Sequence, residues 1–176
     1  MRNIIYYVAI SIDGYISSTN NDISDFKADG DGVAQYLKDL QSFDTVIMGR
    51  RTYEFGYQYG LEPGQPPYPH MQHYIFSNTL QLRDKHPLVH VEGLSLDRLI
   101  KIKEMEGTDI YLCGGGVFAG WLLNNQLIDR IKIKLNPLIL GSGIPMFVGV
   151  KRSYQLQELA QQNYDDLQIV EYVVTY

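Results

Sequence analysis

Three consecutive glycines, Gly114-Gly115-Gly116, stand between an apolar segment that ends at Cys113 and a helix-like segment that begins at Val117. Because no side chain shields the backbone there, a ligand can approach the main chain closely, and the first N–H groups of the helix can bind a phosphate. A diphosphate-bearing nucleotide fits such a turn. The alternative interpretation is that the glycines serve only tight packing of the helix against the strand.

Two familiar nucleotide motifs fail on their context. Residues 114–119 match the G-x-G-x-x-A pattern of a Rossmann fold, which requires an acidic residue at the end of the next strand, about 20 positions on. Asp129 comes too early and stands at the beginning of that strand. No glycine turn is followed by Gly-Lys-Ser/Thr, which argues against a phosphate-loop kinase or ATPase.

Two further polar groups follow apolar, strand-like segments. Gly49-Arg50-Arg51-Thr52 comes after one, and Ser77-Asn78 comes after another. Arginine suits phosphate recognition through bidentate hydrogen bonds, although two adjacent arginines are also typical of a solvated surface. In an open α/β sheet ligands bind at the carboxyl ends of the strands, so the shared position of these groups favours one binding edge.

The apolar pattern predicts the elements that must position these groups. Buried strands are expected at 4–10, 45–48, 74–77, 88–91, 109–113 and 131–135, helices at 32–42 and 96–105 and after the glycine turn, and two closing strands at 154–161 and 167–175. Alternating strands and helices followed by a closing pair predict a three-layer α/β fold whose sheet is mostly parallel with an antiparallel C-terminal edge. The polar stretch 17–32 predicts a long loop, typical of a lid.

The composition limits the class of protein. The chain has 176 residues, of which 45% are hydrophobic, and one domain spanning 1–176 is expected. The formal net charge of -5 argues against a general nucleic-acid binder. The first apolar run is too short to span a bilayer, the four histidines show no metal-binding spacing, and Cys113 is the only cysteine. We therefore expect a cytoplasmic protein without a metal, a membrane segment or nucleic acid as a partner.

Several ordered blocks carry a resemblance to a known family. They are Ala9-Ile10-Ser11-Ile12-Asp13-Gly14-Tyr15-Ile16, Val46 to Tyr53, Phe76 to Thr79, Leu112 to Phe118 and Asn136 to Phe147. In this order they resemble the dihydrofolate reductase superfamily, and most closely the branch that contains the reductase domain of the bifunctional riboflavin-biosynthesis deaminase/reductase. The resemblance covers nearly the whole chain.

The resemblance implies a homodimeric, NADPH-dependent reductase, and it implies which residues surround the cofactor. Ala9, Ile10, Asp13 and Gly14 would line the nicotinamide, Gly49, Arg50, Arg51 and Thr52 would hold the adenosine-side phosphates, Ser77 and Asn78 would lie near the ribose phosphate, and Gly114, Gly115, Gly116, Val117 and Phe118 would embrace the pyrophosphate. It also implies a cis peptide between Gly114 and Gly115.

The chain departs from the folate enzymes on the substrate side. By the resemblance, Val33 occupies the position of the carboxylate on the first helix, and an isopropyl group cannot relay a proton. Asp29 or Asp31 could replace the missing acid, although both also suit the cap of a helix, which is the interpretation we favour. No arginine precedes the third strand to clamp a glutamate tail. Tyr53 could wall a planar ligand or could serve packing.

These observations favour an NADPH-dependent reductase that transfers a hydride to a C=N or C=O group of a small pterin- or pyrimidine-like substrate. Two alternatives stay open. The chain could bind the nucleotide without turnover, since the acid at Val33 is missing. It could also be the 5-amino-6-(5-phosphoribosylamino)uracil reductase of riboflavin biosynthesis, although no second phosphate motif is present.

Overall fold

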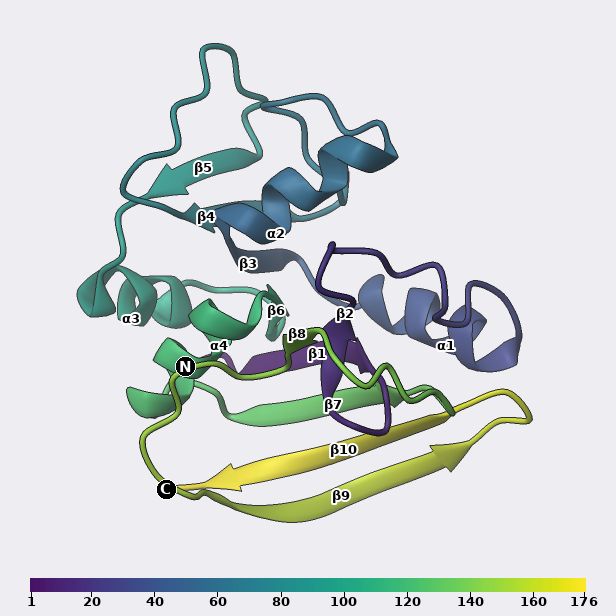
Figure 1. Cartoon of the computed structure of the whole chain (residues 1–176). Helices are drawn as coiled ribbons and strands as arrows, with labels where there is room; N and C mark the ends of the chain where they lie inside the picture. Colours follow the sequence, from purple (N-terminus) through teal and green to yellow (C-terminus); the bar gives the residue numbers. More distant parts are fainter.

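An eight-stranded sheet with strand order β5-β4-β3-β6-β1-β7-β10-β9 forms the centre of the computed structural model, which describes residues 1–176 (Figure 1). Its strands are β1 (Ile4–Ile10), β3 (Thr45–Gly49), β4 (Gln72–Phe76), β5 (Val89–Glu92), β6 (Ile110–Gly114), β7 (Arg130–Leu135), β9 (Gln155–Asn163) and β10 (Gln168–Thr175). The first six are parallel, and β10 pairs antiparallel with both β7 and β9. The predicted parallel sheet with an antiparallel C-terminal edge is confirmed.

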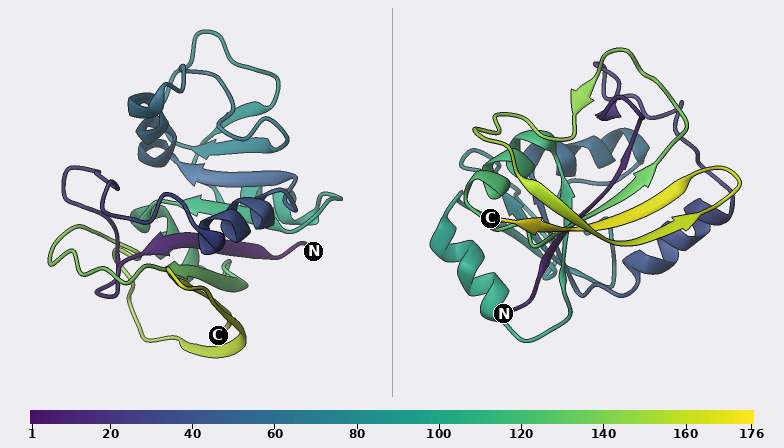
Figure 2. Two further views of the ribbon diagram at one scale, coloured as in Figure 1. Left: turned by 90° about the vertical axis from the view of Figure 1, so that its right-hand side faces the viewer. Right: turned by 90° about the horizontal axis from the view of Figure 1, so that it is seen from below.

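Helices cover both faces of the sheet, which gives three layers (Figure 2). The helices are α1 (Asp31–Leu40), α2 (Arg50–Phe55), α3 (Leu96–Glu104) and α4 (Gly116–Asn124), and a 3₁₀ turn (Gly56–Tyr59) follows α2. The buried residues of α1 and α2 share one core with one face of the sheet, and those of α3 and α4 share a second core with the other face.

The position of β1 inside the sheet explains why its sequence is continuously apolar. Tyr6 and Val8 join the core beneath α3 and α4, whereas Ile5 and Tyr7 join the core beneath α1 and α2. Because successive side chains of a strand point to opposite faces, a strand covered on both sides needs apolar residues at every position. The predicted strand at 4–10 therefore coincides with the observed one.

One short pair of strands was not predicted. β2 (Tyr15–Ser17) pairs antiparallel with β8 (Ile144–Pro145). Segments of two or three residues show no hydrophobic period, so only the contact between distant parts of the chain reveals them. Ser95 caps α3, since its side chain accepts a hydrogen bond from the Arg98 N–H.

The predicted loop between β2 and α1 is tied to the sheet at two points. The Lys27 N–H donates to Asn136 Oδ1 at 3.1 Å, and Lys134 Nζ donates to the Lys27 carbonyl at 3.2 Å. Phe26 beside them is buried. The loop thus covers the carboxyl end of β7. No helix in the structure has the length and apolar character that crossing a bilayer would require.

Candidate functional site

The glycine, arginine and hydroxyl groups singled out from the sequence meet at one edge of the sheet. Gly49 ends β3 beside Phe76 of β4, and Met48 is in register with Gly114 of β6. Because these strands are parallel, the residues that follow each of them emerge at the same edge. The expectation that three strand ends converge is therefore met by the strand register.

The first two glycines of the turn leave an open cradle beside Thr52. Gly114 has φ +129°, which side chains rarely adopt, and its peptide bond to Gly115 is cis. A Cβ on Gly115 would lie 3.0 Å from Thr52 Oγ1. Gly115 is the N-cap of α4 and supplies no side-chain hydrogen bond, so the first N–H groups of this helix have no side-chain partner. Such a helix start attracts an anionic group.

The third glycine serves packing instead. A Cβ on Gly116 would overlap the carbonyl oxygen of Pro145, and one on Gly120 would overlap that of Val148. The Val148 N–H also donates to the Gly116 carbonyl at 3.0 Å. The chain that follows β8 thus lies directly against α4. The packing interpretation of the triple glycine therefore applies to Gly116, whereas Gly114 and Gly115 leave their backbone open to a ligand.

The two arginines differ in how they are held. Arg50 donates through Nε to Glu54 at 2.8 Å and through Nη1 to Thr79 Oγ1 at 2.9 Å. Arg51 is exposed and takes part in none of the ion pairs of the chain. Arg50 therefore connects α2 to the turn after β4, while the guanidinium of Arg51 is free to bind an anion.

The residues after β4 build a turn with their own side chains. Ser77 Oγ accepts hydrogen bonds from the N–H groups of Thr79 at 3.1 Å and Leu80 at 2.9 Å. Asn78 Oδ1 accepts from the Leu94 N–H at 3.1 Å. These acceptors are already used, so the Ser77 hydroxyl hydrogen and the Asn78 NH₂ group are what this turn can offer to a ligand.

The segment after β1 is held by Asp13. Its carboxylate accepts hydrogen bonds from the N–H groups of Leu140 at 3.1 Å and Gly141 at 2.7 Å. The Ser11 hydroxyl first, and then these N–H groups, hold the pKa of Asp13 below its ordinary value. Gly14 adopts φ +85°, and its carbonyl accepts from the Met146 N–H. Asp13 and Gly14 thus fix the turn in which Ala9 and Ile10 end.

Two of the residues predicted to face a substrate are buried. Val33 is buried in the core beneath α1, and Tyr53 is 1% exposed, with its hydroxyl bonded to Gly64 N and Gln65 O. The suggestion that Tyr53 forms the wall of a ligand site is wrong, because its ring is buried and its hydroxyl is bonded to the backbone of the loop before β4. Asp29 and Asp31 are exposed, but Gly30 is the N-cap of α1 and no side chain caps this helix, so their interpretation as caps is wrong.

The sequence analysis missed a group of three tyrosine hydroxyls and one thiol between α1 and the sheet. The hydroxyl oxygens of Tyr36 and Tyr111 lie 3.0 Å apart, and the Tyr68 hydroxyl lies 3.7 Å from Cys113 Sγ. Burial raises the pKa of all four groups above their ordinary values. The only sequence signal was that Tyr36 follows Val33 by three residues, which places both on one face of a helix.

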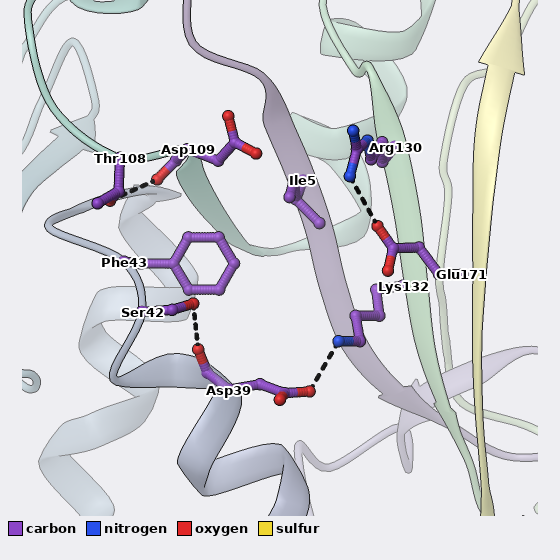
Figure 3. A pocket seen from close by; sticks show the side chains of 9 residues that line it. All are labelled: Ile5, Asp39, Ser42, Phe43, Thr108, Asp109, Arg130, Lys132 and Glu171. Carbon is purple, nitrogen blue, oxygen red and sulfur yellow. Dashed lines mark hydrogen bonds and ion pairs between the residues drawn. The ribbon is translucent and has the colours of Figure 1, made fainter. Parts of the chain in front are cut away.

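A separate hollow of about 360 Å³ lies at the amino edge of the sheet (Figure 3). Four of the charged side chains that line it form ion pairs, Lys132 with Asp39 at 2.7 Å and Arg130 with Glu171 at 3.3 Å. The carboxylate of Asp109 accepts a hydrogen bond from the Asn3 N–H at 2.9 Å. None of the residues predicted for cofactor binding lines it. We therefore assign the candidate site to the carboxyl edge.

Comparison with known proteins places the chain in a family. The model of the RibD C-terminal domain matches residues 2–169. The uncharacterized protein YwjB of Bacillus subtilis is 30% identical over 152 residues, 83% of each chain. A Shewanella sp. PV-4 protein provisionally assigned to riboflavin biosynthesis is 23% identical, with a TM-score of 0.82 over 100% of both chains.

Dihydrofolate reductase from Enterococcus faecalis, solved with NADP(H), is 14% identical with a TM-score of 0.71 over 99% of this chain and 97% of its own. The two solved structures show a common fold, which is the dihydrofolate-reductase-like fold expected from the sequence. The family model, which matches almost the entire chain, shows more than the fold: the protein belongs to the RibD C-terminal domain family, whose fold is that of a reductase.

Proposed function

We propose that the protein is an NADPH-dependent reductase that transfers a hydride to a small planar substrate. The observation that carries this proposal is the carboxyl edge of the sheet, where the open Gly114–Gly115 turn, the start of α4 and the free guanidinium of Arg51 lie on neighbouring strands. Unpaired donors gathered at one edge match an elongated anion with phosphates in its middle and at one end.

The residues present fit such a cofactor. The start of α4 and the cradle between Gly115 and Thr52 would hold the pyrophosphate, and Arg51 would contact a phosphate on the adenosine side. The turn fixed by Asp13 would place Ala9 and Ile10 against the nicotinamide. The bound cofactor would supply the hydride, and the protein would contribute position and exclusion of water.

The loop between β2 and α1 provides part of that exclusion. Its backbone at Lys27 is bonded to the buried side chains of Lys134 and Asn136, so the loop lies across the end of β7. Since Ala9 and Lys134 are register partners, this end of β7 adjoins the end of β1. The substrate would enter between the loop and α1.

A second candidate function is the uracil-derivative reductase of riboflavin biosynthesis. The family match favours it, because the matching model is named for the reductase half of RibD. The third candidate, nucleotide binding without turnover, rests on Val33, which is buried and carries no proton donor. The three differ in whether an acceptor is reduced and in which one.

Titration of the protein with NADPH and with NADH, followed by nucleotide fluorescence, tests the cofactor. Oxidation of NADPH is then followed at 340 nm with dihydrofolate, 7,8-dihydropterin, pyrimidine derivatives and simple aldehydes as acceptors. We expect NADPH to bind more tightly than NADH and one of the smaller acceptors to be reduced. Tight binding without oxidation of any acceptor would favour the protein without turnover, and absence of binding would contradict the proposal.

We further propose that two copies of the chain form a homodimer through β9. Every residue of β9 is exposed, and its outer edge has no partner strand. Antiparallel pairing of two copies about Leu159 places Glu158 opposite Ala160, so no like charges face each other. Sedimentation equilibrium should give a dimer for the wild type and a monomer for Leu159→Lys. A monomeric wild type contradicts this pairing.

A further inference from the structure

Four uncharged protic side chains gather between α1 and the sheet, and we call them the hydroxyl cluster. Tyr36 comes from α1, Tyr111 and Cys113 from β6, and Tyr68 from the loop before β4. Tyr111 is almost fully buried, and the other three are half-buried. Tyr111 thus forms the floor of the cluster, and the hydroxyl of Tyr36 rests on it at 3.0 Å.

The cluster adjoins the edge where the cofactor is proposed to bind. Cys113 immediately precedes Gly114, the first glycine of the turn. The ring of Tyr36 packs edge-on against the ring of Tyr7 in β1, with centroids 4.8 Å apart. Two residues further along β1, and on the same face, lies Ala9. A substrate bound between α1 and the end of β1 would therefore lie on the face of the sheet that Tyr36 covers.

The carboxylates of α1 are unsuited to donate a proton in this space. Val33, one turn before Tyr36, carries no acid, and Asp31 is exposed at the start of the helix. Asp39, one turn after Tyr36, is bonded to Lys132 at 2.7 Å and to the Tyr7 hydroxyl at 3.0 Å. This carboxylate already accepts hydrogen bonds from a cation and a hydroxyl, so it is held away from a substrate.

We propose that the hydroxyl of Tyr36, held in place by Tyr111, is the proton donor of this reductase and that it serves the oxygen of a carbonyl substrate. The inference rests on the proposed function, from which the reduced nicotinamide supplies the hydride. The hydride adds to the carbonyl carbon, the π electron pair of the C=O bond moves to oxygen, and that oxygen takes the proton of Tyr36. The phenolate then regains a proton from water.

The acidity of a phenol selects a carbonyl over an imine. A phenol has a pKa near 10 and a carboxylic acid one near 4, so the phenol is the weaker acid by about six units. Hydride adds readily to an imine only after the imine nitrogen has been protonated, and a phenol is too weak an acid to protonate it beforehand. A carbonyl oxygen instead takes its proton as negative charge develops on it during hydride transfer, and a phenol is acidic enough for that step. Burial raises the pKa of Tyr36 further, which keeps the hydroxyl protonated at neutral pH.

Two groups beside Tyr36 offset part of the cost that burial imposes on the phenolate. The Tyr111 hydroxyl can donate a hydrogen bond to it, and Lys134 Nζ lies 5.2 Å from the centre of the Tyr36 ring. A nearby positive charge and a hydrogen-bond donor both stabilise an oxyanion. Tyr111 is thus a positioning residue, and Tyr36 is the group that contacts the substrate.

Kinetics with two acceptors test the inference, namely 4-nitrobenzaldehyde as the carbonyl and 7,8-dihydropterin as the C=N compound. We expect the wild type to reduce the aldehyde faster. Tyr36→Phe removes one oxygen atom and keeps the ring, and it should lower kcat for the aldehyde by about 100-fold or more, with KM changed much less. Tyr111→Phe should lower kcat about ten-fold and retain a solvent deuterium isotope effect, which Tyr36→Phe should alter.

Two measurements separate chemistry from folding. The affinity for NADPH should match the wild type in Tyr36→Phe. The midpoint of thermal unfolding should fall no more in Tyr36→Phe than in Tyr111→Phe, because both lose the same hydrogen bond. Tyr59→Phe, which alters an exposed tyrosine, should retain full activity. Unchanged kcat in Tyr36→Phe, or faster reduction of dihydropterin than of the aldehyde, overturns the inference and leaves the proposed function intact. A wild type that binds NADPH and reduces neither these two acceptors nor dihydrofolate and the pyrimidine derivatives overturns both.

Discussion

The two edges of the central sheet carry charged groups in different states. At the carboxyl edge the guanidinium of Arg51 and the first N–H groups of α4 have no side-chain partner. At the amino edge Lys132 is paired with Asp39 and Arg130 with Glu171 around a visible hollow (Figure 3). Most charged groups at the amino edge are therefore already paired, and the edge with the unpaired donors is the one that can gain from a ligand.

The difference teaches that shape alone does not locate this site. A polar group that already has a partner gains little by exchanging it for a ligand, whereas an unpartnered donor gains a whole hydrogen bond. The contrast between Gly115 and Gly116 follows the same logic. A Cβ on Gly115 would face the end of a side chain, while one on Gly116 would meet the backbone of Pro145.

The strongest test of this contrast is Gly116→Ala. A methyl group there would overlap a backbone carbonyl that cannot move without displacing β8, so we expect a loss of about 3 kcal/mol in the free energy of unfolding. Urea unfolding measures it. The matched control is Gly93→Ala, since a Cβ on Gly93 meets nothing closer than 3.5 Å. Equal midpoints for the two variants would show that Gly116 is not packed as described.

A change in pH tests whether His73, near the start of β4, is shielded from water. His73 is fully buried, its Nε2 accepts from the Tyr68 N–H, and burial lowers its pKa to about 4. Between pH 6.5 and pH 4 the imidazole of His73 is protonated in the unfolded chain and neutral in the folded protein. The contribution of His73 to the free energy of unfolding is therefore fully present above pH 6.5 and decreases as the pH falls below it. The loss is about 3 kcal/mol when complete.

Urea unfolding at pH 7.0 and pH 4.5 measures this loss, with His73→Gln as the comparison, because glutamine keeps a neutral acceptor and does not titrate. We expect the wild type to lose about 2 kcal/mol more than the variant over this interval. Parallel losses in the two proteins would mean that other groups dominate the acid sensitivity.

The sequence predicted the features that depend on local pattern. The strand at Ile4–Ile10 and the turn at Gly114 are marked by continuous apolar residues and by glycines, so their types and positions were predicted correctly. The pairing of Tyr36 with Tyr111 joins residues 75 positions apart, and no local period reveals it. The same holds for the packing of Pro145 against Gly116, which joins residues far apart in the sequence.

The unpaired arginine allows a direct test of the carboxyl edge. Arg51→Ala should raise the Kd for NADPH about ten-fold or more, because one charge-assisted hydrogen bond contributes roughly 1.5–3 kcal/mol. Fluorescence titration measures the change. Arg50→Ala should have a smaller effect on the Kd, since Arg50 is already bonded to Glu54 and Thr79. Equal affinity in Arg51→Ala and the wild type would remove this residue from the site.

Replacement of an arginine by alanine at the amino edge should have the smallest effect on stability and on NADPH binding. Arg130 lies 3.3 Å from Glu171 and is more than one-third exposed, and exposed ion pairs of this kind contribute at most about 1 kcal/mol. Arg130→Ala should therefore shift the urea midpoint slightly and leave the Kd for NADPH unchanged. Addition of salt should weaken NADPH binding to the wild type and to Arg130→Ala alike, since Arg51 is present in both. If Arg130→Ala weakened NADPH binding as much as Arg51→Ala does, the two edges would not differ as the pairing of their charges implies.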